Sequence, residues 1–119
     1  MSLAGVDVWK RHKTKRNKLR FYKTLIPTIK RVARECGYCA AIHGSMTRDL
    51  DILLVPWVEG ALLPETVIIR IQEALEIPKW FRHTRMQLKK QCTKKPHGRR
   101  AWAVCVGADV YLDFSAVGK

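Results

Sequence analysis

Three aspartates set among apolar residues are the side chains of this sequence best suited to hold a divalent cation. Asp49 and Asp51 are separated by one residue and lead into an apolar run at residues 52–55. Alternate residues of a strand point to the same face, so these two carboxylates are expected side by side. Neighbouring carboxylates repel, and a cation between them relieves the repulsion. Their oxygen atoms suit Mg²⁺ or Mn²⁺, hard cations that also bind phosphate oxygens.

The third aspartate, Asp113, lies between Leu112 and Phe114 in the last apolar stretch of the sequence. If this stretch pairs beside the strand of Asp49 and Asp51, three carboxylates converge. A two-metal site for phosphoryl or nucleotidyl transfer needs such a set of acids. In a purely structural interpretation, Asp49 caps a turn and Asp113 faces solvent from a strand.

A short polar turn precedes the aspartate pair and has the composition of a phosphate-binding loop. Gly44 allows the backbone to approach a phosphate closely, and the hydroxyl of Ser45 can bind phosphate oxygens. Arg48 follows, and it can contribute to phosphate binding or pair with a neighbouring acid.

Two helices are predicted from the spacing of apolar residues. The first runs from Leu19, with apolar residues at steps of three and four, and Gly37 can end it. Pro27 either kinks this helix or restarts it. The second helix is predicted from Pro64 to about Glu76.

The strands are predicted from short apolar runs. Residues 38–43 and 49–55 have the pattern of buried strands, and the second run continues directly from the aspartate pair. Residues 101–106 and 110–114 predict a β-hairpin with a turn at 107–109. Residues 79–98 are basic and interrupted by proline and glycine, so they are expected to be irregular.

This order of elements predicts an α+β fold, a small mixed sheet of about four strands with helices packed on one face. The length of 119 residues suits a single hydrophobic core. Residues 1–18 are expected to form a basic N-terminal arm, either mobile or continuous with the first helix. Residues 19–119 are expected to form one domain.

With these motifs in view, the sequence resembles the DNA polymerase beta-like nucleotidyltransferase superfamily in its minimal single-domain form. The residues that carry the resemblance are Gly44 and Ser45, the pair Asp49 and Asp51, and Asp113 between apolar neighbours. The resemblance implies the same core and Mg-dependent transfer of a nucleotidyl group from a nucleoside triphosphate to an acceptor hydroxyl.

The resemblance also implies a role for each matching residue. Asp49 and Asp51 would hold both metal ions, Mg²⁺ or Mn²⁺, while Asp113 would hold the catalytic metal and help to activate the acceptor hydroxyl. Gly44 and Ser45 would bind the triphosphate. The family pattern usually has a short helix after the Gly-Ser pair, but here only residues 46–48 separate Ser45 from Asp49. The turn must therefore be tight.

The net charge of +13 is distributed in three blocks and predicts a polyanionic partner. Residues 1–35 hold eleven Lys and Arg against two acids, residues 36–78 hold two against six, and residues 79–119 hold ten against two. RNA or DNA is the expected partner, with the nucleoside triphosphate as the second polyanion. The expected phosphate contacts are Lys15, Arg16, Lys18, Lys94, Lys95, Arg99 and Arg100.

Other interpretations stay open at this point. The same fold can serve as a non-catalytic basic module that binds nucleic acid or inhibits another protein, or as a small subunit that needs a partner protein chain. Cys36 and Cys39 have the spacing of half a zinc site, but Cys92 and His97 lack the usual tight spacing of the second half. No apolar run reaches the ~18 residues needed to span a bilayer, so a cytoplasmic protein without a membrane partner is expected.

Overall fold

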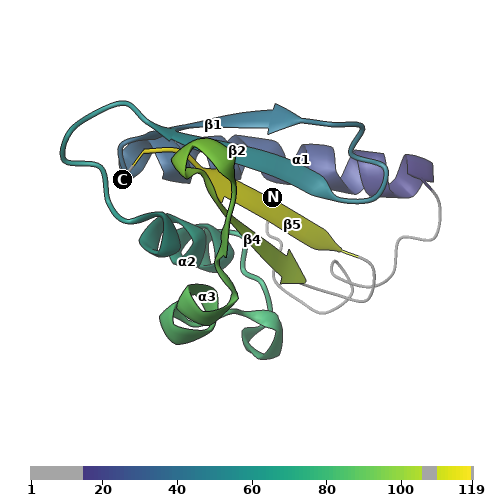
Figure 1. Ribbon diagram of the computed structural model, residues 1–119. Helices are drawn as coiled ribbons and strands as arrows, with labels where there is room; N and C mark the ends of the chain where they lie inside the picture. The colour runs from purple at the N-terminus through teal and green to yellow at the C-terminus, as the bar shows by residue number, and fades with distance from the viewer. Residues whose placement is uncertain (1–14, 106–109, 119) are drawn as a thin grey trace.

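A mixed sheet of five strands organises the computed structural model, which describes residues 15–105 and 110–118 (Figure 1). Its strand order is β1-β2-β5-β4-β3. Strands β2 and β5 pair in parallel, and the other neighbouring strands pair antiparallel. The strands are β1 (Tyr38–His43), β2 (Leu50–Pro56), β3 (Thr93–Lys94), β4 (Arg100–Cys105) and β5 (Tyr111–Ala116).

Three α-helices accompany the sheet in this part of the chain: α1 (Lys15–Glu35), α2 (Pro64–Ala74) and α3 (Arg85–Gln91). Two 3-10 turns lie between them and the strands, η2 (Lys79–Phe81) and η3 (Pro96–Gly98). Helix α1 continues through Pro27 and does not restart there. Within the described ranges, no helix is both long enough and apolar enough to cross a membrane.

The hydrophobic core lies between the helices and one face of the sheet. Alternate residues of β2, namely Leu50, Ile52 and Leu54, are fully buried, whereas those between them are half-buried. The same alternation occurs in β5, where Phe114 is buried and Asp113 is half-buried. Because strand side chains alternate between faces, the aspartates of β2 and β5 stand on the face opposite the core.

The predicted α+β class is confirmed, including a mixed sheet with helices against it. The sheet has one strand more than expected, because β3 adds two residues to the edge of β4. Residues 79–98 were expected to be irregular, but they contain α3 as well as β3. Thr84 caps α3 and Gln87 completes a reciprocal capping box, a local signal that a search for apolar periodicity does not detect.

The expected arm at residues 1–18 falls mostly outside the described residues. Residues 1–14 are among those that the structure does not describe, and residues 15–18 form the first turn of α1. The expected hairpin is present as β4 and β5, which pair from Cys105 and Tyr111 onward. Its predicted turn at 107–109 lies outside the described residues.

Candidate functional site

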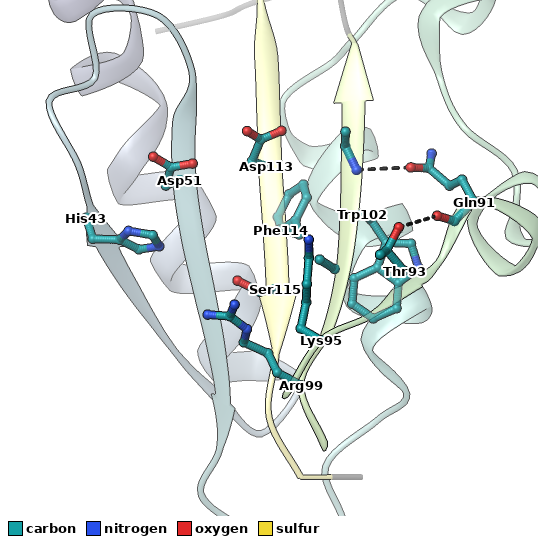
Figure 2. Close-up of a pocket in the computed structure, with 12 residues that line it drawn as sticks. His43, Asp51, Gln91, Thr93, Lys95, Arg99, Trp102, Asp113, Phe114 and Ser115 are labelled. Atoms are coloured by element: carbon teal, nitrogen blue, oxygen red, sulfur yellow. Dashed lines mark hydrogen bonds between the residues drawn. The ribbon is translucent and has the colours of Figure 1, made fainter. Parts of the chain in front are cut away.

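Parallel pairing of β2 with β5 brings the three aspartates together. Asp51 and Asp113 are register partners in this pair, so their side chains lie on the same face of adjacent strands, which run about 4.8 Å apart. Figure 2 shows both carboxylates on that face. Asp49 lies one residue before β2, and its carboxyl group is close enough to that of Asp113 to raise the pKa of Asp113.

The electrostatics of Asp113 reflect this crowding. Burial, the largest cause, acts together with the nearby carboxyl groups of Asp49 and Asp51 to raise the pKa of Asp113 from 3.8 to about 6. The cluster therefore holds a proton at a pH where isolated aspartates are ionised.

Gly44 is required where β1 ends beside the cluster. Its φ is +79°, and a Cβ atom at this position would lie 2.6 Å from Oδ2 of Asp51. A side chain here would thus be strained by the backbone and would collide with the carboxylate. The close approach that the sequence suggested for a phosphate is made by Asp51. His43 precedes this glycine and pairs with Asp51 across β1 and β2.

The loop between β1 and β2 is short and tightly bent, as the spacing predicted. It contains no helix, and Met46 adopts φ 59°, an unusual conformation for a residue with a side chain. Tyr22 of α1 fixes the end of the loop, because its hydroxyl donates to the carbonyl of Arg48 at 2.7 Å. The same hydroxyl accepts from the amide of Tyr111 at 3.2 Å, which joins α1, the loop and the start of β5.

A cleft of about 530 Å³ opens on the sheet face that carries the aspartates. Asp51 and Asp113 line one part of it, and Lys95 and Arg99, from the segment that includes β3 and η3, line another. Figure 2 shows both basic side chains extending over β5 on the same face as the two carboxylates. The polar residues His43, Gln91, Thr93 and Ser115 complete much of the lining.

The predicted phosphate-binding residues of the loop have other contacts. The hydroxyl of Ser45 shares a hydrogen bond of 2.9 Å with that of Thr47 and also accepts from the Thr47 amide. Gly44, Ser45 and Arg48 are not part of the cleft lining in the described structure. Of these three, only Gly44 has a described contact with the carboxylates, through Asp51.

The predicted nucleic-acid contacts are separated by the fold into four places. Lys15, Arg16 and Lys18 belong to the first turn of α1, and Nζ of Lys18 lies 3.5 Å from the carbonyl of Arg48. Lys95 and Arg99 are in the cleft, whereas Lys94 is exposed outside its lining.

Arg100 lies elsewhere and has structural contacts. Its guanidinium is 3.8 Å from the buried carboxylate of Glu65 and 5.6 Å from the centre of the Trp102 ring. Trp102 itself is buried, as predicted, and its Nε1 donates to the carbonyl of Leu88. These contacts anchor β4 to α2 and α3.

The donor set of the cluster suits a hard divalent cation, because it consists of carboxylate oxygens that otherwise repel one another. Within residues 15–105 and 110–118, no group of three or more His, Cys, Asp or Glu side chains stands in an arrangement that could hold a metal ion. A bound cation would compete with the proton that Asp113 holds because of its raised pKa.

Four polar lining residues were not among the predicted site residues: His43, Gln91, Thr93 and Ser115. His43 and Ser115 become visible only from strand register, because they lie opposite residues of β2 on the open face. Gln91 and Thr93 come from the segment expected to be irregular. No known family model, curated protein or solved structure matches this chain.

Proposed function

We propose that this protein is a nucleotidyltransferase that uses Mg²⁺ or Mn²⁺ to move a nucleotidyl group from a nucleoside triphosphate to an acceptor hydroxyl. The observation that carries the proposal is the register pairing of Asp51 with Asp113, with the carboxyl group of Asp49 close to that of Asp113. The fold brings three carboxylates near one another although more than sixty residues separate the first from the last. The family resemblance drawn from the motifs agrees with this chemistry.

The surroundings of the carboxylates also support the proposal. Lys95 and Arg99 border the same cleft, and cationic side chains can bind the oxygens of a triphosphate. A cleft with carboxylates at one part and cationic side chains at another suits a cation–triphosphate complex. The carboxylates would face the cation, and the cationic side chains would face the triphosphate.

The proposal gives each residue a role. Asp49 and Asp51 would hold the metal ions, and Asp113 would complete the set and help to activate the acceptor hydroxyl. Bound Mg²⁺ would supply charge stabilisation for the phosphoryl oxygens. Lys95 and Arg99 would orient the triphosphate, and Gly44 would keep space for the Asp51 carboxylate.

A transfer assay tests the proposal directly. The purified protein is incubated with each α-³²P-labelled triphosphate, Mg²⁺ or Mn²⁺, and a mixture of RNA, DNA and lysate protein. Label should move to an acceptor with the wild type and not with the Asp49→Asn/Asp51→Asn double variant or with Asp113→Asn. Glu73→Gln, which removes an exposed acid from α2, is the matched control and should remain active.

The opposite result would favour a binding role for the same fold. If label is never transferred, and if salt-sensitive binding of nucleic acid is equal in the wild type and the Asp49→Asn/Asp51→Asn variant, the nucleotidyltransferase proposal fails. The remaining function would then be the non-catalytic basic module, which needs phosphate contacts but no metal.

A further inference from the structure

An aromatic side chain and a methionine stand exposed on the segment formed by η2 and α3. Trp80 is 71% exposed and Met86 is 67% exposed. Met86 and Lys90 are four residues apart on α3 and therefore share one helix face, while Leu88 points into the core. Trp80, Met86, Lys89 and Lys90 are named here the η2–α3 surface.

The charge of this segment has one sign. Residues 77–105 contain nine Lys and Arg and no Asp or Glu. Arg85 is engaged with α2 through Oγ1 of Thr66, whereas Lys89 and Lys90 are exposed on the last turn of α3. An exposed aromatic ring and exposed cations on one segment are the combination that binds the bases and phosphates of a single strand.

The η2–α3 surface is held in place by specific contacts. The side-chain amide of Gln72 binds both the amide and the carbonyl of His83, at 2.8 and 3.0 Å. Nε of Arg82 donates to the carbonyl of Ile77, and Leu88 is fully buried. Trp80 is therefore exposed on an anchored segment, which lowers the entropy lost when a ligand stacks on it.

Further contacts of this segment connect the η2–α3 surface to the cleft. Gln91, which lines the cleft, contacts Nδ1 of His83 through Nε2 at 3.2 Å and accepts from the amide of Ala103 through Oε1 at 3.0 Å. Trp80 is three residues from His83, so their Cα atoms are at most about 11 Å apart. Figure 1 shows α3 next to the end of the sheet that contains β4.

We infer that the η2–α3 surface binds single-stranded nucleic acid, with a base stacked on Trp80 and phosphates on Lys89 and Lys90. The bound strand then extends with one end toward the cleft. This inference names the acceptor of the proposed transfer and in that respect rests on the proposed function. An acidic protein segment would satisfy the charges but would leave the exposed indole without a planar partner. A duplex would satisfy the phosphates but keeps its bases stacked internally.

Fluorescence anisotropy with a labelled oligothymidylate of about 12 nucleotides tests the inference without any triphosphate. Trp80→Ala should weaken binding about 5- to 150-fold, and Trp80→Phe should restore most of it, because a ring remains for stacking. Trp57→Ala is the matched control, since Trp57 is also exposed, at 63%, and lies in the β2–α2 connection. Circular dichroism checks that each variant is folded.

A second pair of variants separates location from net charge. Lys89→Glu/Lys90→Glu should weaken binding more than Lys23→Glu/Lys30→Glu, which makes the same charge change on exposed positions of α1. Equal loss in both variants, or no difference between Trp80→Ala and Trp57→Ala, would overturn the inference. Equal binding of polyglutamate or of a duplex would overturn it as well.

The two proposals fail in different ways. Asp51→Asn should leave oligothymidylate binding unchanged, because the carboxylate cluster is not part of the η2–α3 surface. Transfer activity without Trp80-dependent binding would overturn the acceptor inference and leave the proposed reaction intact. Trp80-dependent binding without any transfer would overturn the reaction and leave the binding surface.

Discussion

Asp113 is the residue on which the electrostatics of the site converge. It is half-buried, lies beside two other carboxyl groups, and has a pKa raised to about 6. Burial is the largest cause, and repulsion from Asp49 and Asp51 adds to it. A residue in this state destabilises the folded protein once it is ionised, unless a cation compensates it.

The stability of the protein should depend on pH through this residue. In the unfolded chain Asp113 ionises near pH 3.8, whereas in the folded chain it keeps its proton until about pH 6. Relative to Asp113→Asn, the wild type should therefore lose stability as the pH rises from about 4 to about 6, and then change no further. Urea unfolding of both proteins across this range measures the difference. A difference that does not vary with pH would contradict the raised pKa.

Added Mg²⁺ should reverse this loss near pH 7. A cation bound by the ionised cluster stabilises the folded state, and the stabilisation increases with the ratio of the cation concentration to its dissociation constant. The wild type should gain thermal stability with Mg²⁺, and Asp113→Asn should gain less. Equal gains in thermal stability in both proteins would show that Mg²⁺ acts at a site that does not include Asp113.

Gly44 can be tested against a glycine with a similar backbone and no neighbour. Gly44 and Gly98 have φ of +79° and +72°, but a Cβ on Gly98 would meet nothing within 4 Å. Gly98→Ala should cost about 1–2 kcal/mol of unfolding free energy from backbone strain alone. Gly44→Ala should cost more and should also weaken the Mg²⁺ effect, because it displaces the Asp51 carboxylate. Equal costs would show that the contact with Asp51 is unimportant.

At the scale of elements, the site depends on three segments that one hydroxyl group joins. Tyr22 of α1 bonds the carbonyl before Asp49 and the amide of Tyr111 at the start of β5. The two segments that the Tyr22 hydroxyl joins, the loop leading into β2 and the start of β5, lead directly to the three aspartates. Their relative position is thus set by a buried polar contact as well as by sheet register.

Tyr22→Phe should therefore affect both stability and activity. Loss of the hydroxyl leaves the Arg48 carbonyl without that donor and should cost about 1–3 kcal/mol. Tyr38→Phe is the matched control, because the buried Tyr38 hydroxyl donates to the Leu62 carbonyl at 2.7 Å, away from the site. Both variants should unfold at lower urea, but only Tyr22→Phe should lower kcat in the transfer assay. Equal kcat values would show that the contact is only structural.

At the scale of the whole molecule, the fold joins two blocks of opposite charge. The acidic middle of the sequence supplies Asp49 and Asp51, and the basic last third supplies Lys95 and Arg99. Asp51, Lys95 and Arg99 line one cleft because β3 and β4 continue the sheet that contains β2 and β5. The net charge predicts a polyanionic ligand, and this meeting point indicates where it would bind.

The cleft cations can be tested by their effect on triphosphate binding. Lys95→Ala/Arg99→Ala should raise KM for the triphosphate about tenfold or more, since each charge-assisted contact contributes about 1.5–3 kcal/mol. Lys94→Ala, an exposed neighbour outside the lining, should change KM little. A similar rise in both variants would indicate a diffuse field rather than direct contacts.

Several elements of this protein could be derived from the sequence by itself. The apolar run at residues 38–43 corresponds to β1, and that at 49–55 is shifted by one residue in β2. Pro64 starts α2, and the last two apolar stretches form an antiparallel pair. These elements have strong local periodicity or a proline at a boundary, so neighbouring residues suffice to specify them. The α+β class follows from their order.

Contacts between distant segments were decided only by the tertiary structure. Parallel pairing of β2 with β5 depends on register, and a shift of one residue would send Asp113 to the core face. The approach of Lys95 and Arg99, the contact of Gly44 with Asp51 and the separate burial of Arg100 likewise join segments far apart in the sequence. Local patterns contain no information about such distances, because they depend on how the whole core packs.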